Sequence, residues 1–168
     1  VLQYIVRTQA KHPGRRIKND DNSFTVQNDA RELGDNEFHF ISNRIWTIYP
    51  DGSVELNSSV TGSDANALLA RIGYMMQLPT ELKNYTYYGR GPWNNYNDRR
   101  TGAFIQQYAS TVADQFVHFP KPQDMANREE VRWAALTNDA GNGVIFVILS
   151  IGRCYTYYSW RCKIDRVG

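Results

Sequence analysis

A glycine-rich loop near the middle of the chain, residues 87–100, collects the side chains that a sugar site needs. Aromatic rings stack on the apolar face of a pyranose, and the polar groups of Asn, Asp and Arg hydrogen-bond its hydroxyls. The candidate contacts in this loop are Tyr88, Arg90, Trp93, Asn95, Tyr96, Asp98 and Arg99. The structural alternative is that Arg90, Asp98 and Arg99 pair with one another and only pin the loop.

A second polar loop, residues 120–133, supplies further candidates, which are Gln123, Asn127, Arg128, Glu130 and Arg132. Arg128, Glu130 and Arg132 alternate along the chain, so they would line one face of a strand. Such a ladder is most often structural, and as a site it would present hydrogen-bond donors around one carboxylate. Neither loop is a nucleotide motif, since Gly89 and Gly91 lack the third glycine and the following helix of a dinucleotide fingerprint.

The sequence around both loops predicts strands. Tyr, Phe and Trp make up 13% of the chain and favour strands, and the turn at Pro50, Asp51 and Gly52 joins the halves of a hairpin over 37–60. Residues 68–78 fit a helix or a strand. The other expected strands are 2–6, 24–27, 83–88, 104–108, 116–119, 131–136 and 144–149. Repeated short strands with turns between them predict an all-β, antiparallel β-sandwich, a single domain over 1–168.

Composition narrows the classes of function. The chain has 168 residues, enough for one domain with a core, and a net charge of +2 with opposite charges interspersed. We therefore expect no nucleic-acid partner, and no membrane span because no apolar run is long enough. Cys154 and Cys162 have no zinc-type spacing; they pair across a hairpin or remain thiols. No set of side chains has metal-ligand spacing.

Three ordered motifs resemble the C-terminal small-chain domain of glycoside hydrolase family 2 β-galactosidases. Residues 88–99 are similar to its YGRGPxENYxDR signature, residues 122–133 to PQENGNRxxVRW, and residues 108–117 to YxSTVxDQYV. The resemblance is dense over 70–147 and weaker over 46–60. The tail, 148–168, is atypical.

The resemblance implies a galactose mutarotase-like supersandwich, here truncated at its C-terminal end. In the family this domain supports a catalytic TIM barrel and helps to wall its sugar-binding cleft. Both catalytic glutamates lie in that barrel, so we expect this chain alone to have no catalytic residue and to be inactive. The expected partners are the barrel and a galactoside substrate.

The same resemblance places magnesium and sodium ions in the barrel, so we expect no cofactor and no metal ligand here. It implies a soluble protein of the bacterial cytoplasm or periplasm. Because the chain begins at Val1 without Met, we expect a piece of a longer protein. Missing last strands would expose a sheet edge, which a homo-oligomer or the aromatic tail 154–160 would cover.

Several positions depart from the family pattern. Asn94 stands where the family usually has Glu, Asn97 where it has Pro, Met125 where it has Asn, and Trp93 where His is common. These changes remove polarity and add a stacking surface.

Two other functions stay open. The first is an autonomous carbohydrate-binding module built on the loop 87–100. The second is an aldose 1-epimerase, for which His118 with Asp124 or Glu130 is the available acid–base set. Retaining glycoside hydrolysis needs two carboxyl groups about 5–5.5 Å apart. On a strand, Glu129 and Glu130 would face opposite sides and could not share one bond.

Overall fold

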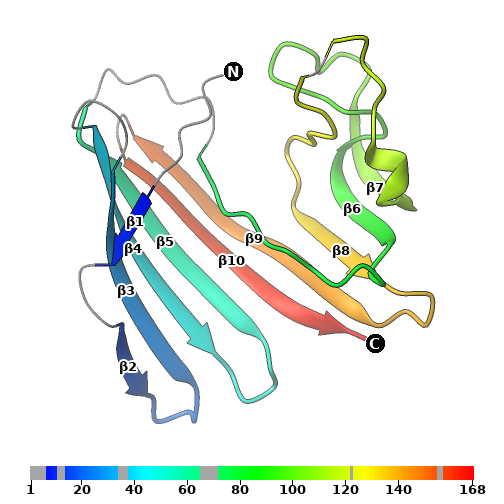
Figure 1. Cartoon of the computed structure of the whole chain (residues 1–168). Helices are drawn as coiled ribbons and strands as arrows, with labels where there is room; N and C mark the ends of the chain where they lie inside the picture. Colours follow the sequence, from blue (N-terminus) through cyan, green and yellow to red (C-terminus); the bar gives the residue numbers. More distant parts are fainter. Residues whose placement is uncertain (1–6, 11–13, 34–37, 65–71, 122, 155–156) are drawn as a thin grey trace. The chain divides into compact units, whose positions relative to one another are not determined.

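The computed structural model describes residues 7–10, 14–33, 38–64, 72–121, 123–154 and 157–168 (Figure 1). These residues form ten strands and one short 3₁₀ helix, with no α-helix among them. The all-β prediction is confirmed. The expected strand at 2–6 lies outside the described residues. The described part of 68–78, residues 72–78, forms neither a helix nor a strand.

The elements are β1 (Arg7–Ala10), β2 (Arg15–Lys18), β3 (Phe24–Leu33), β4 (His39–Ile48), β5 (Val54–Gly62), β6 (Asn84–Gly91), β7 (Phe104–Thr111), η1 (Ala113–Gln115), β8 (Trp133–Thr137), β9 (Gly143–Cys154) and β10 (Tyr157–Val167). The strand pairs β1–β3, β2–β3, β3–β4, β4–β5, β6–β7, β6–β8 and β8–β9 are all antiparallel, as in a β-sandwich.

The chain divides into two compact units. Unit 1 comprises residues 1–75 and 149–163, and unit 2 comprises 76–148 and 164–168. The strands β9 and β10 each contribute residues to both units. The expectation of a single domain over 1–168 stays a prediction.

Unit 1 is built on the consecutive strands β3, β4 and β5, with β1 and β2 both paired to β3. The predicted hairpin is confirmed, because Ile48 pairs with Val54 across the turn. In that turn Asp51 accepts a hydrogen bond from the backbone of Ser53, and Gly52 adopts a φ of 85°, which glycine tolerates best. Local turn chemistry therefore sets the register of β4 against β5.

The period of two expected for a half-buried strand is clear in β5. Leu56, Ser58 and Val60 are buried on one face, together with Ala30 and Phe40 from the neighbouring strands. Ser58 is buried without an energetic penalty because its hydroxyl donates to the carbonyl of Asn43.

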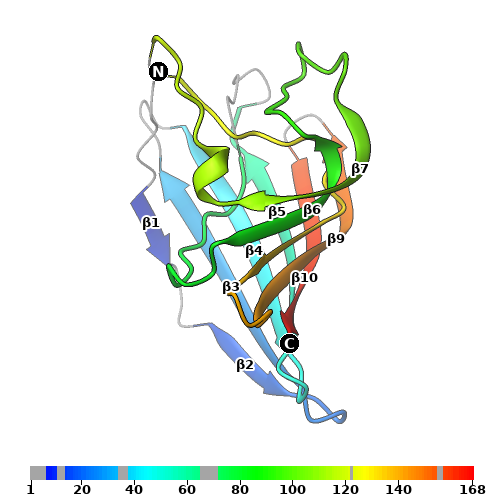
Figure 2. The same ribbon diagram turned by 90° about the vertical axis from the view of Figure 1, so that its right-hand side faces the viewer.

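Unit 2 positions both candidate loops. Its central strand β6 pairs with β7 on one side and β8 on the other (Figure 2), and β8 pairs with the first part of β9. Tyr87 on β6 is 1% exposed, and its ring lies 5.0 Å from that of Tyr85 and 5.4 Å from that of Tyr108. Tyr87 and Ala135 are the buried hydrophobic residues described for this unit, and the half-buried Tyr85 and Tyr108 flank Tyr87.

Two sequence predictions about this unit are wrong. Residues 116–119 are irregular rather than a strand, because the chain turns at η1, where the Asp114 carboxylate accepts hydrogen bonds from the amide and hydroxyl of Thr111. Residues 128–132 are not extended either, since Glu130 has a φ of 52°. That left-handed residue breaks the alternation on which the expected ladder of Arg128, Glu130 and Arg132 depended.

Candidate functional site

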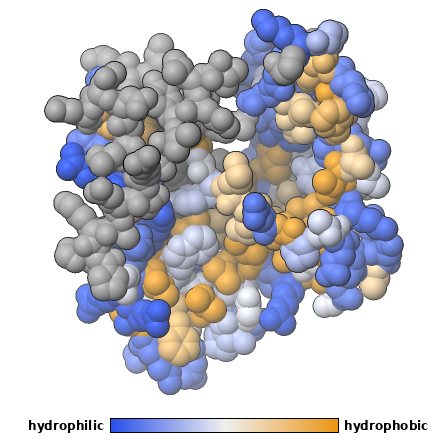
Figure 3. Space-filling view, in the orientation of Figure 1, coloured by the Kyte–Doolittle hydropathy of each residue, from blue (hydrophilic) through white to orange (hydrophobic). Residues whose placement is uncertain are grey.

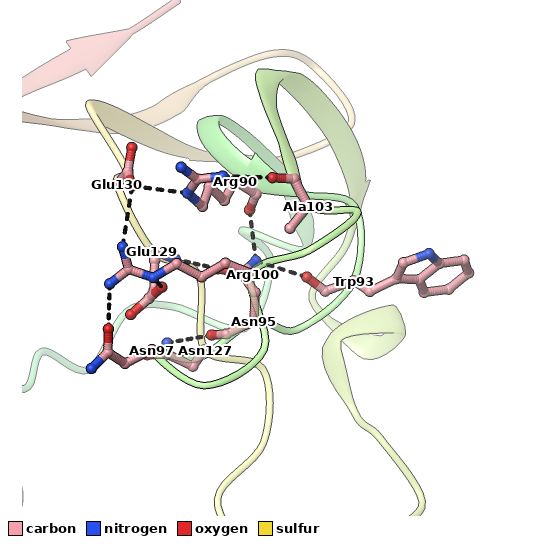
Figure 4. A network of polar contacts seen from close by, with 9 residues as sticks. All are labelled: Arg90, Trp93, Asn95, Asn97, Arg100, Ala103, Asn127, Glu129 and Glu130. Atoms are coloured by element: carbon pink, nitrogen blue, oxygen red, sulfur yellow. Dashed lines mark hydrogen bonds and ion pairs between the residues drawn. The ribbon is translucent and has the colours of Figure 1, made fainter.

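The buried amide of Asn95 joins the two loops that the sequence singled out (Figure 4). Its Nδ2 donates to the carbonyls of Arg90 and Trp93, both at 3.0 Å, and its Oδ1 accepts from the amide of Glu129 at 2.8 Å. Its own backbone exchanges two hydrogen bonds with Asn127, at 2.9 and 2.6 Å. Asn95 is fully buried, so it positions the loops from inside.

A layer of ion pairs covers this amide. Arg90 Nε lies 2.9 Å from Glu130 Oε1, and its Nη1 donates to the carbonyl of Ala103. Arg100 Nε lies 2.8 Å from Glu129 Oε2 and its Nη1 lies 3.8 Å from Glu130 Oε1. The hydrogen bond from Arg90, with the charges of both arginines, lowers the pKa of Glu130 below its usual range. Glu130 is therefore held as a carboxylate, and both neighbouring glutamates lie beside guanidinium groups.

The alternative for the first loop, in which Arg90, Asp98 and Arg99 pair with one another, is wrong. Arg90 binds Glu130 from the second loop, and no ion pair joins it or Arg99 to Asp98 among the residues described. Arg99 instead lies over the ring of Tyr96, 4.8 Å from its centroid. Asp98 is exposed. The loop is therefore fixed by contacts to its neighbour more than by contacts within itself.

At two positions of β6, atoms of other residues lie so close to the backbone that only glycine fits. A Cβ at Gly89 would lie 2.9 Å from the Cα of Val131, and one at Gly91 would overlap the Tyr87 hydroxyl and lie 2.7 Å from the ring of Tyr108. The Gly-x-Gly spacing thus allows the second loop and the tyrosine core to pack against this strand.

Arg128 crosses from the second loop to the tyrosine core. Its Nε donates to the Tyr87 hydroxyl at 2.8 Å, its Nη2 to Gln115 Oε1 at 2.7 Å, and its Nη1 to the carbonyl of Asn127 at 3.1 Å. All three acceptors are neutral. Burial raises the pKa of Tyr87, and the nearby guanidinium opposes that rise.

Beside this arginine lies a pocket of about 430 Å³. Its lining residues are Tyr87, Pro92, Trp93, Asn94, Tyr108, Ala109, Ser110, Asp114, Gln115, Phe116, Val117, His118 and Arg128. Trp93 is 77% exposed, and its ring points away from the polar network (Figure 4). Apolar side chains show among hydrophilic ones over this unit, at the upper right of Figure 3.

Of the sugar-contact candidates, the structure brings Trp93 and Arg128 into this pocket. His118 of the epimerase alternative also lines it, but its expected partners Asp124 and Glu130 do not. Asn95 and Asn127 hold the loops together, and Arg90 and Glu130 form an ion pair outside the pocket. The remaining candidates, exposed or half-buried and outside the pocket, are Tyr88, Tyr96, Asp98, Arg99, Gln123 and Arg132.

Sequence reasoning did not choose several polar or aromatic members of the pocket as site residues, among them Asn94, Tyr108, Ser110, Asp114, Gln115 and Phe116. Asn94 carried a signal, because it departs from the family pattern. Tyr108 and Ser110 lie on β7, Asp114 and Gln115 lie in η1, and Phe116 begins the segment 116–119 that was expected to be a strand. The described residues contain no cluster of three His, Cys, Asp or Glu side chains that could hold a metal ion. None of their helices is long and apolar enough to cross a membrane.

The fold places the chain among the all-β proteins of antiparallel strands. Its sequence matches the family model of the β-galactosidase small chain over residues 6–163, and the chain therefore belongs to this family. The match confirms the resemblance seen in the motifs, and it extends on both sides of the dense stretch 70–147.

Individual relatives of the chain are also β-galactosidases. A β-galactosidase of Priestia megaterium is 35% identical over 100 residues, which is 60% of this chain and 10% of the relative. A β-galactosidase of Lactobacillus delbrueckii subsp. bulgaricus is 34% identical over 90 residues, 54% of this chain and 9% of the relative. The chain thus aligns with about a tenth of the length of these enzymes.

Proposed function

We propose that this chain is the non-catalytic, C-terminal part of a β-galactosidase, which supports the catalytic barrel and shapes the cleft for the galactoside. The family match over 6–163 supports this proposal, as does the small share of the relatives that the chain spans. Under this proposal any magnesium or sodium ion belongs to the barrel, and the partners are the barrel and its substrate.

The observation that carries the proposal is the cross-linking of the two motif loops through Asn95. A wall beside an active site must hold its shape when substrate arrives, because misplacement by about 1 Å can cost a factor of about 100 in rate. Asn95 supplies such rigidity, since its amide and backbone connect residues 90–95 to residues 127–129.

The two adjacent glutamates are poor candidates for acid–base catalysis. A glycosidase acid needs a carboxyl group whose pKa is raised, so that it is protonated near neutral pH. The pKa of Glu130 is lowered, chiefly by its hydrogen bond from Arg90. Glu129 is likewise paired with Arg100. Their geometry therefore suits a structural role in the loop wall.

A two-part assay tests the proposal. The purified chain should not hydrolyse a nitrophenyl β-galactoside, and it should bind a separately purified catalytic-barrel fragment of a related β-galactosidase, as measured by calorimetry. In the assembled enzyme, Asn95→Ala should lower kcat/KM for the galactoside. Turnover by the chain alone, or no binding to the barrel, would contradict the proposal.

An autonomous carbohydrate-binding module is the second candidate, and the exposure of Trp93 beside a pocket favours it. Exposed aromatic rings commonly supply contact area at binding surfaces. Saturable binding of galactose or lactose by the isolated chain, lost in Trp93→Ala, would support this role independently of any barrel.

A further inference from the structure

Arg128 is a half-buried cation that has no carboxylate partner among the residues that the structure describes. Each of its three nitrogens donates to a neutral oxygen, namely the Tyr87 hydroxyl, the Gln115 side chain and the Asn127 carbonyl. Charges removed from water are usually compensated by an opposite charge. Arg90 and Arg100, by contrast, have glutamate partners. Within the described part of the chain, Arg128 therefore lines the pocket without a carboxylate to offset its charge.

Two further groups lining the pocket have hydrogen-bonding capacity to spare. The Nδ2 atom of Asn94 is buried, and no described residue accepts a hydrogen bond from it, which costs free energy unless something else accepts one. Ser110 Oγ accepts a hydrogen bond from Gln115 Nε2 at 2.7 Å, so its own proton is available to a ligand. Asn94, Ser110 and Arg128 all offer donors, which together suit a carboxylate.

The remaining lining indicates a ring with hydroxyl groups. Trp93 and Phe116, exposed by 77% and 58%, give the pocket two aromatic surfaces. Asp114 is the one carboxylate in the lining; its Oδ2 accepts from Thr111, and it forms no ion pair with Arg128. A carboxylate accepts hydrogen bonds from hydroxyls, so Asp114 favours a sugar over an aromatic acid.

We propose that this pocket binds a sugar acid, with the ligand carboxylate beside Arg128 and Asn94, its ring against Trp93, and its hydroxyls toward Asp114. The volume of about 430 Å³ lies within the range of small-molecule sites. The pocket uses residues of unit 2 only and needs no catalytic barrel, so the proposal stands apart from the role in a β-galactosidase.

Titration of the ¹⁵N-labelled chain, followed by NMR, tests the proposal with three probes. D-galacturonate carries both the carboxylate and the hydroxyls, D-galactose lacks the carboxylate, and cyclohexanecarboxylate lacks the hydroxyls. We expect saturable shifts at the Trp93 indole and the Asn94 side-chain amide with galacturonate, and at least tenfold weaker binding of the other two. Binding of galacturonate should weaken as sodium chloride is raised, because the contact to Arg128 is an ionic one.

Variants separate the pocket from the rest of the surface. Trp93→Ala and Asn94→Ala should each weaken galacturonate binding, whereas Phe104→Ala, which removes another exposed ring outside the pocket, should not. Arg128 itself is a less suitable target, because it holds three neighbours in place. Equal binding of galactose and galacturonate, or no shift with galacturonate at tens of millimolar, would overturn the proposal. Either result leaves the assay with the catalytic barrel unaffected.

Discussion

At the scale of single residues, the side chain of Asn95 joins backbone groups from two loops. Replacing it by alanine leaves the carbonyls of Arg90 and Trp93 and the amide of Glu129 without that partner. Buried polar groups that lose a partner cost about 1–3 kcal/mol each before relaxation. We expect Asn95→Ala to lower the free energy of unfolding by about 2–4 kcal/mol, measured by urea denaturation.

The matched control is Asn97→Ala. Asn97 is exposed and accepts one hydrogen bond, from Arg100. Its loss should change the free energy of unfolding by less than about 0.5 kcal/mol. Equal effects of the two substitutions would show that Asn95 does not cross-link the loops.

Gly91 makes a second prediction at this scale. Alanine there would bring its Cβ onto the Tyr87 hydroxyl and the Tyr108 ring. Overpacking of this kind costs about 1–3 kcal/mol, and we expect the thermal midpoint of Gly91→Ala to fall accordingly. Gly73→Ala is the control, because no described residue beyond its two chain neighbours has an atom within 4 Å of the added Cβ. A Gly91→Ala protein as stable as the control would contradict the close packing.

At the scale of elements, the sequence was most informative where local chemistry decides the structure. Proline and glycine at residues 50–52 placed the β4–β5 hairpin, and alternation along β5 placed its buried face. The apolar run at 116–119 was misleading, because a turn held by Asp114 precedes it. Periodicity carries no information about such a side-chain contact, so the pocket beside η1 could not be found from the sequence.

The candidate site, too, could be predicted from the sequence only in part. The motifs placed Arg90 and Glu130 among functional residues, and the structure brings these two together, although as an ion pair. Their pairing depends on the left-handed backbone at Glu130. A non-glycine residue rarely adopts that conformation, so nothing in the sequence around Glu130 predicts it. Long-range loop contacts of this kind decide which candidates face the pocket.

The strand β7 gives a prediction about an element. The amide of Val112 donates to the carbonyl of Lys83, so with the observed register every second residue, including Gln106, bonds to β6. Gln107 then directs its amide away from β6. Proline removes that amide, so Gln106→Pro should cost about 2–3 kcal/mol more than Gln107→Pro in urea denaturation. Equal costs would contradict this hydrogen-bond pattern.

At the scale of the whole molecule, stability should depend on pH at both ends of the range. Hydrogen bonds to the carboxylates, from Arg90 to Glu130 and from Arg161 to Glu55 above all, lower their pKa values in the folded state. The other carboxyl groups with a lowered pKa are Asp21, Asp51, Asp114 and Asp139. Their stabilisation is present above the unfolded pKa of about 4 and is lost as pH falls through the folded values.

The tyrosine core acts in the opposite direction. Burial raises the pKa values of Tyr85 and Tyr87, so their contribution is present below the unfolded pKa of about 10 and is lost as pH rises through the folded values. Urea midpoints should therefore be flat near neutral pH and fall below about pH 4 and above about pH 10. In Glu130→Gln the fall in acid should be shallower, whereas Asp98→Asn, which removes an exposed carboxylate, should leave it unchanged. If the urea midpoints of Glu130→Gln and Asp98→Asn fell equally steeply as pH is lowered, the ion pairs between the two loops would contribute nothing to the stability of the folded state.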